Sequence, residues 1–454
     1  MPASLAQMLG RKARFDDYEV DFARRELRKA GTRVSLQHKP FRVLELLLRH
    51  PGELVKREEL FDFLWPDSHV SFEHGLNTAV NSLRHALGES SRESRFIETR
   101  PGLGYRFIAT VEQVTESDPK AAPPSDSGKS DEAYADYLKG RYFLDRMAGE
   151  EDLYRAIAFF NSAAANERCC PLAHAGIADA YCQLALVGSV APSKVACQAR
   201  SSAAIALSRA PDLADAHVSV GRVKMFFDWD WQGARQSVSR ALELDVNSVS
   251  VHILHASLLV ALGSFGEALQ VCRRAVALDP MSFPANLQFA ACLYAVRDFK
   301  EAIDQCWKML TLRSRFAPAQ MLLALAYVQL GMHEEAVIEF QNARQCAGFQ
   351  AAATSGLGQV FAAAGLEREA EQVFLELSKQ AQDGYLSSYW LAVVSAARGQ
   401  RSSALSFLEE SLRQLDPLML GLKADARFDS IREHERFQIV LRRLDIQNIE
   451  NHLQ

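Results

Sequence analysis

The chain has 454 residues, of which 48% are hydrophobic and 24% charged, and this length predicts two or three folded units instead of one hydrophobic core. Its apolar runs fall short of the roughly 20 residues that span a bilayer, so we exclude a membrane span. The basic residues near the N-terminus follow a short apolar stretch instead of preceding it, so we exclude a secretory signal. We therefore expect a cytoplasmic location. The formal net charge of −5 is unevenly divided. Residues 1–110 hold 18 basic and 15 acidic residues, and the remainder holds 33 basic and 41 acidic residues. This division suits a small module that binds nucleic acid, joined to one that binds proteins.

The first elements expected along the chain form a small antiparallel sheet. Between residues 13 and 36, apolar and polar residues alternate in short runs, and turn-like pairs interrupt them at Asp16–Asp17 and Ala30–Gly31. An amphipathic helix is predicted next, ending at Pro51–Gly52. A second, shorter helix is predicted from about Lys56 to Leu64.

A third helix is predicted over residues 71–88. Its Leu76, Val80, Leu83 and Leu87 recur at the spacing of a buried helix face. The other face is polar and suits hydrogen bonding to base edges or phosphates in a major groove. The candidate DNA-binding residues of this face are Asn77, Thr78, Asn81, Ser82, Arg84 and His85.

Two β-rich segments then follow in RFIETRPGLGYRFIATV, on either side of residues 100–104. This pattern predicts a β-hairpin. Arg100 and Arg106 flank its turn, and we expect them to contact phosphates.

The order of sheet, three helices and terminal hairpin resembles the OmpR/PhoB-type winged helix, the DNA-binding domain of many bacterial transcription regulators. The motifs LRHALG and RPGLGYRF carry the resemblance, which covers residues 13–111. It implies that the third helix enters the major groove and that the hairpin, or wing, touches the adjacent minor groove. Asn81, Ser82 and Arg84 fall where family members contact DNA, and we expect Arg84 to point outward. The family often has arginines at the positions of Asn81 and Ser82, so this chain should hold DNA by weaker electrostatic attraction.

The resemblance also implies a contact with RNA polymerase through the loop before the third helix. The residues of this loop are Trp65, Asp67, Ser68 and His69.

Residues 112–130 are rich in Pro, Ser, Asp and Lys, which predicts a flexible linker. Downstream, alanines recur every 34 residues, and a glycine precedes four of the five by five positions, with Arg297 in that place in the fifth unit. A glycine at this position is expected to end the first helix of each unit in a left-handed conformation. The repeated alanines are Ala268, Ala302, Ala336, Ala370 and Ala404.

Small residues also recur twelve positions before these alanines, and proline closes several units, at Pro211, Pro280 and Pro417. The combined pattern resembles the tetratricopeptide repeat, a helical hairpin that stacks into a superhelix. It covers residues 131–417 in about eight units. The second unit carries some nine extra residues between Tyr181 and Ala199, which should protrude as a longer loop. Residues 418–454 are expected to supply a capping helix and tail.

No catalytic arrangement, Walker loop or zinc signature is present, and the eight cysteines mostly lie in apolar helical pattern without a C-x-x-C pair. We therefore expect no enzyme activity, no cofactor, no metal site and buried thiols in a reducing compartment. Trp229 and Trp231 should fill space at an inter-helix turn.

The predicted fold is an α+β winged helix-turn-helix followed by an all-α tetratricopeptide superhelix. Only some twelve residues precede the winged helix, so no phosphoacceptor receiver is expected, and the arrangement resembles HilA-like regulators, which join this winged helix to soluble repeats. The sequence favours a transcription regulator that binds promoter DNA as two copies on repeated half-sites. Its array is expected to bind a protein or peptide in the tetratricopeptide groove or to sense a small ligand. The alternative is an interaction scaffold whose winged helix contacts proteins instead of specific DNA.

Overall fold

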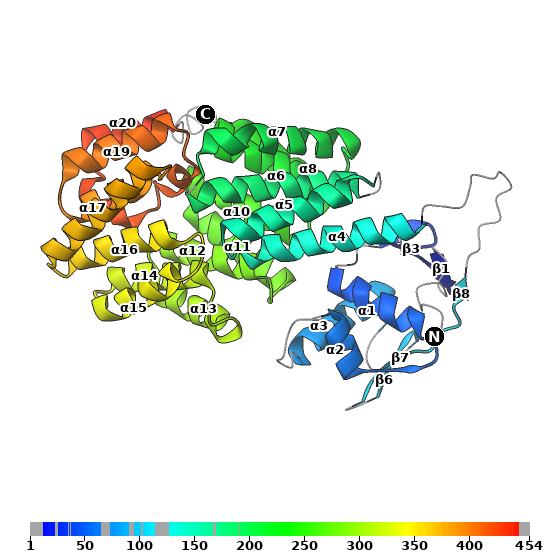
Figure 1. Ribbon diagram of the computed structural model, residues 1–454. Helices are drawn as coiled ribbons and strands as arrows, with labels where there is room; N and C mark the ends of the chain where they lie inside the picture. Colours follow the sequence, from blue (N-terminus) through cyan, green and yellow to red (C-terminus); the bar gives the residue numbers. More distant parts are fainter. Residues whose placement is uncertain are drawn as a thin grey trace. The chain divides into compact units, whose positions relative to one another are not determined.

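The computed structural model describes residues 12–22, 26–34, 36, 38–64, 73–89, 95–100, 103–113, 127–166, 169–188 and 190–444. They fall into two compact units, residues 1–124 and 125–454. Figure 1 shows strands together with helices in the first unit and helices throughout the second.

The N-terminal unit begins with an antiparallel sheet whose strand order is β4-β3-β2-β1-β8. The first four strands lie where a sheet was predicted, whereas β8 lies in residues predicted to be linker, which is wrong for these two residues because they pair with β1. Alternate residues such as Phe15, Tyr18, Val20 and Leu27 are buried, so one face of the sheet covers the core. The bounds are β1 (Lys12–Phe15), β2 (Tyr18–Asp21), β3 (Glu26–Lys29), β4 (Thr32–Val34) and β8 (Glu112–Gln113).

Three helices and a second sheet complete this unit. Its strand order is β5-β7-β6, and β6 and β7 are the predicted hairpin. The short strand β5 was not predicted. It forms because Gly52, with φ of +81°, turns the chain back so that its N–H donates to Phe107 O beside β7. The bounds are α1 (His38–Arg49), β5 (Leu54–Lys56), α2 (Arg57–Leu64), α3 (Glu73–Leu87), β6 (Ile97–Arg100) and β7 (Gly104–Phe107).

The second unit contains eight consecutive helical hairpins among its described residues. The first helices are α4 (Ser127–Arg146), α6 (Cys170–Val187), α8 (Ala214–Val223, continued by the π-helical turn η2, Lys224–Asp228), α10 (Val249–Leu262), α12 (Phe283–Ala295), α14 (Ala317–Gln329), α16 (Gln350–Ala363) and α18 (Ser388–Ala397). The second helices are α5 (Glu150–Ala164), α7 (Pro192–Arg209), α9 (Trp231–Leu244), α11 (Phe265–Leu278), α13 (Phe299–Leu312), α15 (His333–Arg344), α17 (Glu367–Asp383) and α19 (Arg401–Arg413).

The 34-residue alanines mark the helix crossings. All five are fully buried on second helices, where a small side chain lets the paired helix approach. Gly358 shows how tight such a crossing is, because a Cβ added there would lie 2.7 Å from Val373 Cγ1 and 2.9 Å from Val394 Cγ2.

The predicted left-handed turns are confirmed at the four glycines, and Arg297, which was expected to be an exception, adopts the same conformation. Gly263, Gly331, Gly365 and Gly399 have φ between +72° and +87°, and Arg297 adopts φ of +66° in the fifth. The left-handed conformation at this position is therefore kept even in the unit where arginine replaces glycine.

A second repeated device was not predicted. In four consecutive units, one buried or half-buried polar side chain bonds the carbonyl six residues earlier, which fixes the turn before the first helix. The pairs are His217 Nε2 with Pro211 O (2.8 Å), His252 Nε2 with Val246 O (2.9 Å), Asn286 Nδ2 with Pro280 O (2.9 Å) and Gln320 Nε2 with Ser314 O (3.5 Å).

The expectation of a protruding loop in the second unit is wrong. The extra residues lengthen the two helices instead, so that α6 and α7 each have 18 residues and only residues 188–191 join them. Gly188, with φ of +75°, ends α6, and Pro192 begins α7 at a position where its missing N–H costs nothing.

After the last hairpin the chain forms η3 (Pro417–Gly421), η4 (Ala426–Ile431) and α20 (Glu435–Arg443). α20 packs against α19, whereas η3 and η4 lie against first helices, including α6, α10 and α18. We call residues 416–444 the C-terminal segment. Within the part of the chain that the structure describes, no helix is long and apolar enough to cross a bilayer.

Candidate nucleic-acid interface

Helix α3 carries the polar face that the sequence singled out. Leu76, Val80, Leu83 and Leu87 are buried as predicted, and Tyr18 Oη donates a 2.8 Å hydrogen bond to Leu87 O, which ties the end of the helix to the N-terminal sheet. The helix is therefore packed against the core through its apolar face.

Asn81 and Ser82 are exposed on the opposite side of α3. An Asn amide can donate and accept at once, as bidentate pairing with adenine requires, and a Ser hydroxyl can bond a base or a phosphate. Asn77, Thr78 and His85 also lie in α3, but their side chains are outside the described residues.

The expectation that Arg84 points outward is wrong. It is only 5% exposed, and one guanidinium nitrogen donates to Ile97 O (2.8 Å) and to Thr99 Oγ1 (2.6 Å). Arg84 follows directly after a core leucine, and its long side chain turns back toward β6 instead of into solvent. It therefore joins α3 to the wing and is not available to DNA.

The partner of Arg84 is Glu89, a residue that sequence reasoning missed. Its carboxylate is 1% exposed and lies 3.6 Å from Arg84 Nε. It also accepts from the backbone N–H groups of Arg95 (2.8 Å), Phe96 (2.6 Å) and Ile97 (3.1 Å). The signal was an acidic residue directly after Gly88, where the chain leaves α3.

The wing presents two arginines that share one carboxylate. Glu98 and Arg106 face each other across β6 and β7, and Arg100 lies two residues from Glu98 on the same face of the strand. Arg100 reaches Glu98 at 3.0 Å and Arg106 reaches it at 3.4 Å. The two arginines predicted to contact phosphates thus lie on the wing, where both pair with the carboxylate of Glu98.

Gly104 sets the approach of the wing to β5. A Cβ on this residue would lie 2.1 Å from Val55 O, so only glycine allows the two strands to pair here. The glycine of the GLGYRF motif is therefore a requirement of the hairpin.

The predicted polymerase-contact loop, with Trp65, Asp67, Ser68 and His69, lies outside the described residues. Position 100 ends β6, and the next described residue is Leu103, which is exposed.

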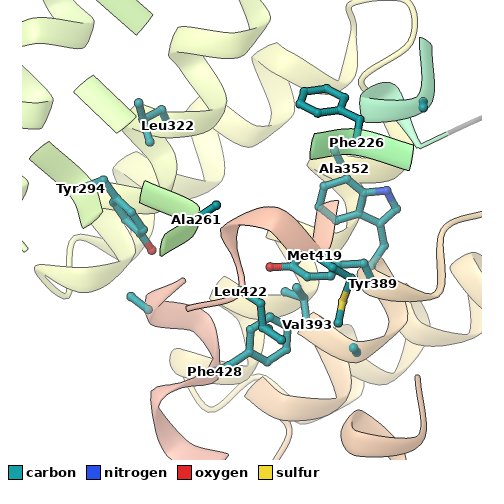
Figure 2. Packing of buried hydrophobic residues seen from close by; sticks show 14 of the residues in the cluster. Phe226, Ala261, Tyr294, Leu322, Ala352, Tyr389, Val393, Met419, Leu422 and Phe428 are labelled. Carbon is teal, nitrogen blue, oxygen red and sulfur yellow. The ribbon is translucent and has the colours of Figure 1, made fainter. Parts of the chain in front are cut away.

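The second candidate surface is the face formed by the first helices of the array, where the sequence led us to expect a peptide groove. The C-terminal segment covers it. Figure 2 shows Met419, Leu422 and Phe428 from this segment beside Tyr389 and Val393 of α18, and all five side chains are buried in one cluster. The same cluster includes Phe226, Ala261, Tyr294 and Leu322 from four earlier hairpins. The chain itself therefore fills this part of the expected groove.

Buried polar contacts anchor the segment. Tyr389 Oη donates to Asp425 Oδ2 at 2.6 Å, and the guanidinium of Arg427 binds both Asp425 oxygens. Burial acts to raise the pKa of Asp425, but the charge of Arg427 and these hydrogen bonds hold the pKa below its ordinary value. The carboxylate is therefore ionised and paired.

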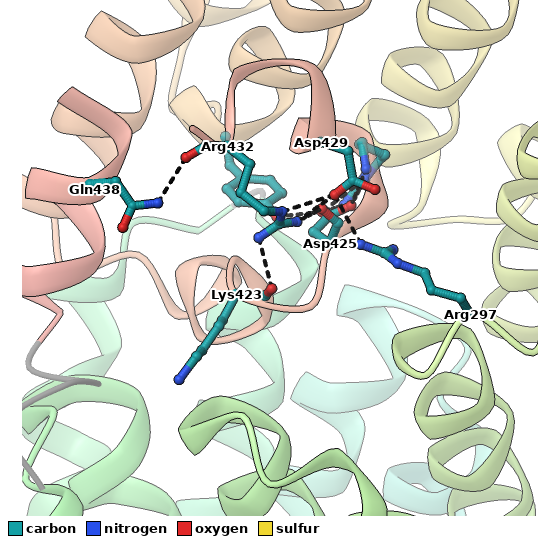
Figure 3. A network of polar contacts seen from close by, with 8 residues as sticks. Arg297, Lys423, Asp425, Asp429, Arg432 and Gln438 are labelled. Carbon is teal, nitrogen blue, oxygen red and sulfur yellow. Dashed lines mark hydrogen bonds and ion pairs between the residues drawn. The ribbon is translucent and has the colours of Figure 1, made fainter. Parts of the chain in front are cut away.

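Further contacts bind the segment to other hairpins. Figure 3 shows Asp429 accepting from both Arg432 and Arg297, the latter at the turn after α12 (2.9 Å). Lys423 Nζ donates to Leu262 O at the end of α10 (3.0 Å), and Trp231 Nε1 donates to Leu444 O (2.8 Å). Trp231 is buried at the start of α9, in agreement with its predicted space-filling role, and it also holds the end of the segment.

Comparisons with known proteins identify both units. Residues 31–107 match the family model for "Transcriptional regulatory protein, C terminal", and residues 317–343 match that for a tetratricopeptide repeat. The transcriptional regulator HilA of Salmonella typhimurium is 36% identical over 106 residues, which are 23% of this chain and 19% of HilA. The cholera toxin transcriptional activator of Vibrio cholerae is 36% identical over 76 residues, which are 16% of this chain and 26% of that protein. The chain thus spans only 19% and 26% of these relatives' lengths.

Two solved structures are also similar. The Klebsiella pneumoniae RstA DNA-binding domain, solved with the RstA box, is 25% identical with a TM-score of 0.21, over 21% of this chain and 96% of that one. PilW, a type IV pilus biogenesis factor, is 20% identical with a TM-score of 0.36, over 45% of this chain and 93% of that one. The N-terminal unit is a winged-helix domain of the OmpR/PhoB type and the second unit is an array of tetratricopeptide-like hairpins, so the predicted fold class is confirmed.

Proposed function

We propose that this chain is a sequence-specific DNA-binding transcription regulator whose helical array binds a protein partner or senses a ligand. The observation that carries the proposal is the family match over residues 31–107, which includes a helix with one buried face and a free polar face. The relatives that match this region are transcription regulators.

In this proposal α3 enters the major groove of duplex promoter DNA. Asn81 and Ser82 read base edges there, with Asn77, Thr78 and His85 on the same helix. Arg100 and Arg106 contact phosphates from the wing after exchanging Glu98 for the DNA backbone. Arg84 orients the wing through its hydrogen bonds to Ile97 and Thr99 and does not contact DNA.

The neutral side chains of α3 have a consequence for affinity. Asn81 and Ser82 are uncharged, so they neutralise no phosphates and release no counterions from DNA. The salt dependence of DNA binding should therefore come mostly from the wing and from other basic residues. Discrimination between sequences should therefore depend on hydrogen bonds to bases more than on charge.

The remaining partners belong to the same proposal. Two copies bind repeated half-sites, and the loop with Trp65, Asp67, Ser68 and His69 contacts RNA polymerase. The regulator acts in the cytoplasm, where it reaches promoter DNA, and it needs no cofactor or catalytic activity. A peptide that bound the first-helix face of the array would have to displace the C-terminal segment, because that segment already buries Met419, Leu422 and Phe428 there.

A binding selection tests the proposal. The full-length chain is incubated with a random duplex library at physiological salt, bound duplexes are sequenced, and the enriched sequence is compared with random duplex by titration. We expect the enriched site to bind at least about 1,000-fold more tightly. Substituting Asn81→Ala should change the enriched sequence, whereas Thr32→Ala, an exposed change on β4, should leave it unaltered.

The alternative function, an interaction scaffold, predicts a different result. Equal affinity for enriched and random duplexes would contradict specific DNA recognition and favour the scaffold, in which the winged helix contacts proteins.

A further inference from the structure

Two cysteines meet across the boundary between neighbouring hairpins. Cys272 on α11 and Cys292 on α12 are both buried, and their sulfur atoms are 3.1 Å apart. α11 ends the hairpin that begins with α10, and α12 begins the next one. A covalent bond between these sulfurs would link two neighbouring hairpins.

The geometry is close to that of a disulfide. Its formation requires the sulfurs to approach from 3.1 Å to about 2.05 Å, a movement of about half an ångström for each side chain. Rotation about the Cα–Cβ bonds can supply a movement of that size without a shift of the helices. The two residues are 20 positions apart, so the bond would also restrict a sizeable loop of the unfolded chain.

The surroundings favour Cys292 as the attacking sulfur. The hydrogen bond from the Cys272 thiol lowers the pKa of Cys292, and burial opposes this effect. The amide of Gln288 adds a donor at 3.8 Å, and Ser257 Oγ holds that amide in place by donating to its oxygen at 3.2 Å.

We propose that Cys272 and Cys292 are a redox-modifiable thiol pair, which hydrogen peroxide converts into a disulfide that links the α10–α11 and α12–α13 hairpins. The Cys292 thiolate attacks one peroxide oxygen, the O–O bond breaks, and the leaving hydroxide takes up the thiol proton to form water. The Cys272 sulfur then attacks the resulting sulfenic acid and loses its proton, and a second water leaves. Two thiols are oxidised by two electrons in total, and one peroxide is reduced to two waters.

The location gives the bond a structural effect. α10 and α12 both hold the C-terminal segment, through Leu262 O and Arg297 respectively. Linking their hairpins would fix the angle between two of the first helices on which that segment lies. Oxidation should therefore make the array more rigid and more resistant to heat.

Thiol mapping of the full-length chain tests the pair. Reduced protein is exposed to hydrogen peroxide, its remaining thiols are alkylated after denaturation, and its peptides are analysed by mass spectrometry. We expect one cross-linked peptide pair that contains Cys272 and Cys292 and that reverts with dithiothreitol. The midpoint of thermal unfolding should rise by a few degrees on oxidation.

Variants supply the controls. Cys272→Ala should leave Cys292 as a sulfenic acid that a dimedone probe captures, and it should abolish the thermal shift. Cys306→Ala, which changes an equally buried cysteine on α13, should retain both the cross-link and the shift.

The proposal is overturned if Cys272 and Cys292 both remain alkylatable after the exposed Cys197 is fully oxidised, or if Cys292 is oxidised beyond the sulfenic acid without forming the cross-link. The readout is thiol chemistry, so it does not depend on DNA binding.

Discussion

At the scale of single residues, the buried pair of Arg84 and Glu89 changes how the polar face of α3 is understood. Both are charged residues near the end of α3, yet their side chains are 6% and 1% exposed. Burying two charges is favourable only if each is paired and hydrogen-bonded, and the contacts with Ile97, Thr99, Arg95 and Phe96 meet that condition. The pair positions the wing against the recognition helix.

Substituting Arg84→Ala should therefore destabilise the N-terminal unit by about 3 kcal/mol, because it leaves the buried Glu89 carboxylate without its positive partner. Chemical denaturation followed by circular dichroism measures this change. Asn81→Ala is the matched control on the same helix and should change stability by no more than about 0.5 kcal/mol. If Arg84→Ala weakened DNA binding without loss of stability, its structural role would be refuted.

Glu98 provides a second test at this scale. Glu98→Gln should raise DNA affinity at low salt by about fivefold, because it frees Arg100 and Arg106 and removes a negative charge that faces the phosphates. Titration of a duplex at two salt concentrations measures the effect, which should shrink at the higher one. An unchanged affinity at low salt would show that neither arginine approaches the phosphate backbone.

At the scale of elements, the repeats contain one pattern that the sequence shows and a second that only the structure shows. Glycine ends the first helices, and its spacing could be read directly from the chain because a left-handed turn favours one residue type. The polar side chains that bond the carbonyl six residues earlier change identity from His to Asn to Gln. Several residue types can place a hydrogen-bond donor beside the carbonyl of the turn. The repeated hydrogen bond therefore leaves no repeated residue in the sequence and appears only in the structure.

The turn into the C-terminal segment should respond to pH through Asp416. Burial raises the pKa of Asp416 to about 6, although Ser387 Oγ and the Leu418 N–H donate hydrogen bonds to its carboxylate. The folded chain thus keeps a proton that the unfolded chain loses near pH 4, so this group's contribution to stability is present below pH 4 and is lost as the pH rises to about 6.

Asp416→Asn removes that titration. Between pH 4 and 7 the stability of the unaltered chain should fall by about 2 kcal/mol relative to the variant. Thermal unfolding of both proteins across this range measures the difference. A constant difference would show that Asp416 titrates at the same pH in the folded and unfolded chains.

At the scale of the whole molecule, the C-terminal segment connects hairpins that are far apart in sequence. It contacts the ends of α10 and α12, the start of α9 and helix α18, and it buries Met419, Leu422, Phe428 and Phe437. Each such side chain contributes about 1.5–3 kcal/mol when it leaves water. The segment is therefore part of the core of the array.

Ending the chain after Leu415 should lower the unfolding midpoint of the array and expose an apolar surface that binds the dye ANS. The reason is that Tyr389, Trp390 and Phe226 lose their covering side chains. Differential scanning calorimetry and dye fluorescence measure the two effects. A chain that ends after Leu444 lacks only residues 445–454 and should behave like the full chain, and equal melting of the two shortened chains would contradict this role.

The division of the chain, the winged helix, the repeat period and the turn glycines could all be predicted from the sequence. Each depends on local spacing: a period of two or 3.6 residues determines which side chains share a face, and a 34-residue period shows that one hairpin is copied. The exposed Asn81 and Ser82 follow from the same reasoning, because residues opposite a core stripe face outward.

Only the tertiary structure decided where Arg84 points, what Glu98 pairs with, how the extra residues of the second hairpin are absorbed, and what covers the first helices. Arg84 has three rotatable bonds beyond its Cβ, and β6, which is more than ten residues away in sequence, determines its direction. η3, which contains Met419, lies against α6 and α10, and η4, which contains Phe428, lies against α18. Such contacts join residues with no fixed spacing, so no sequence period records them.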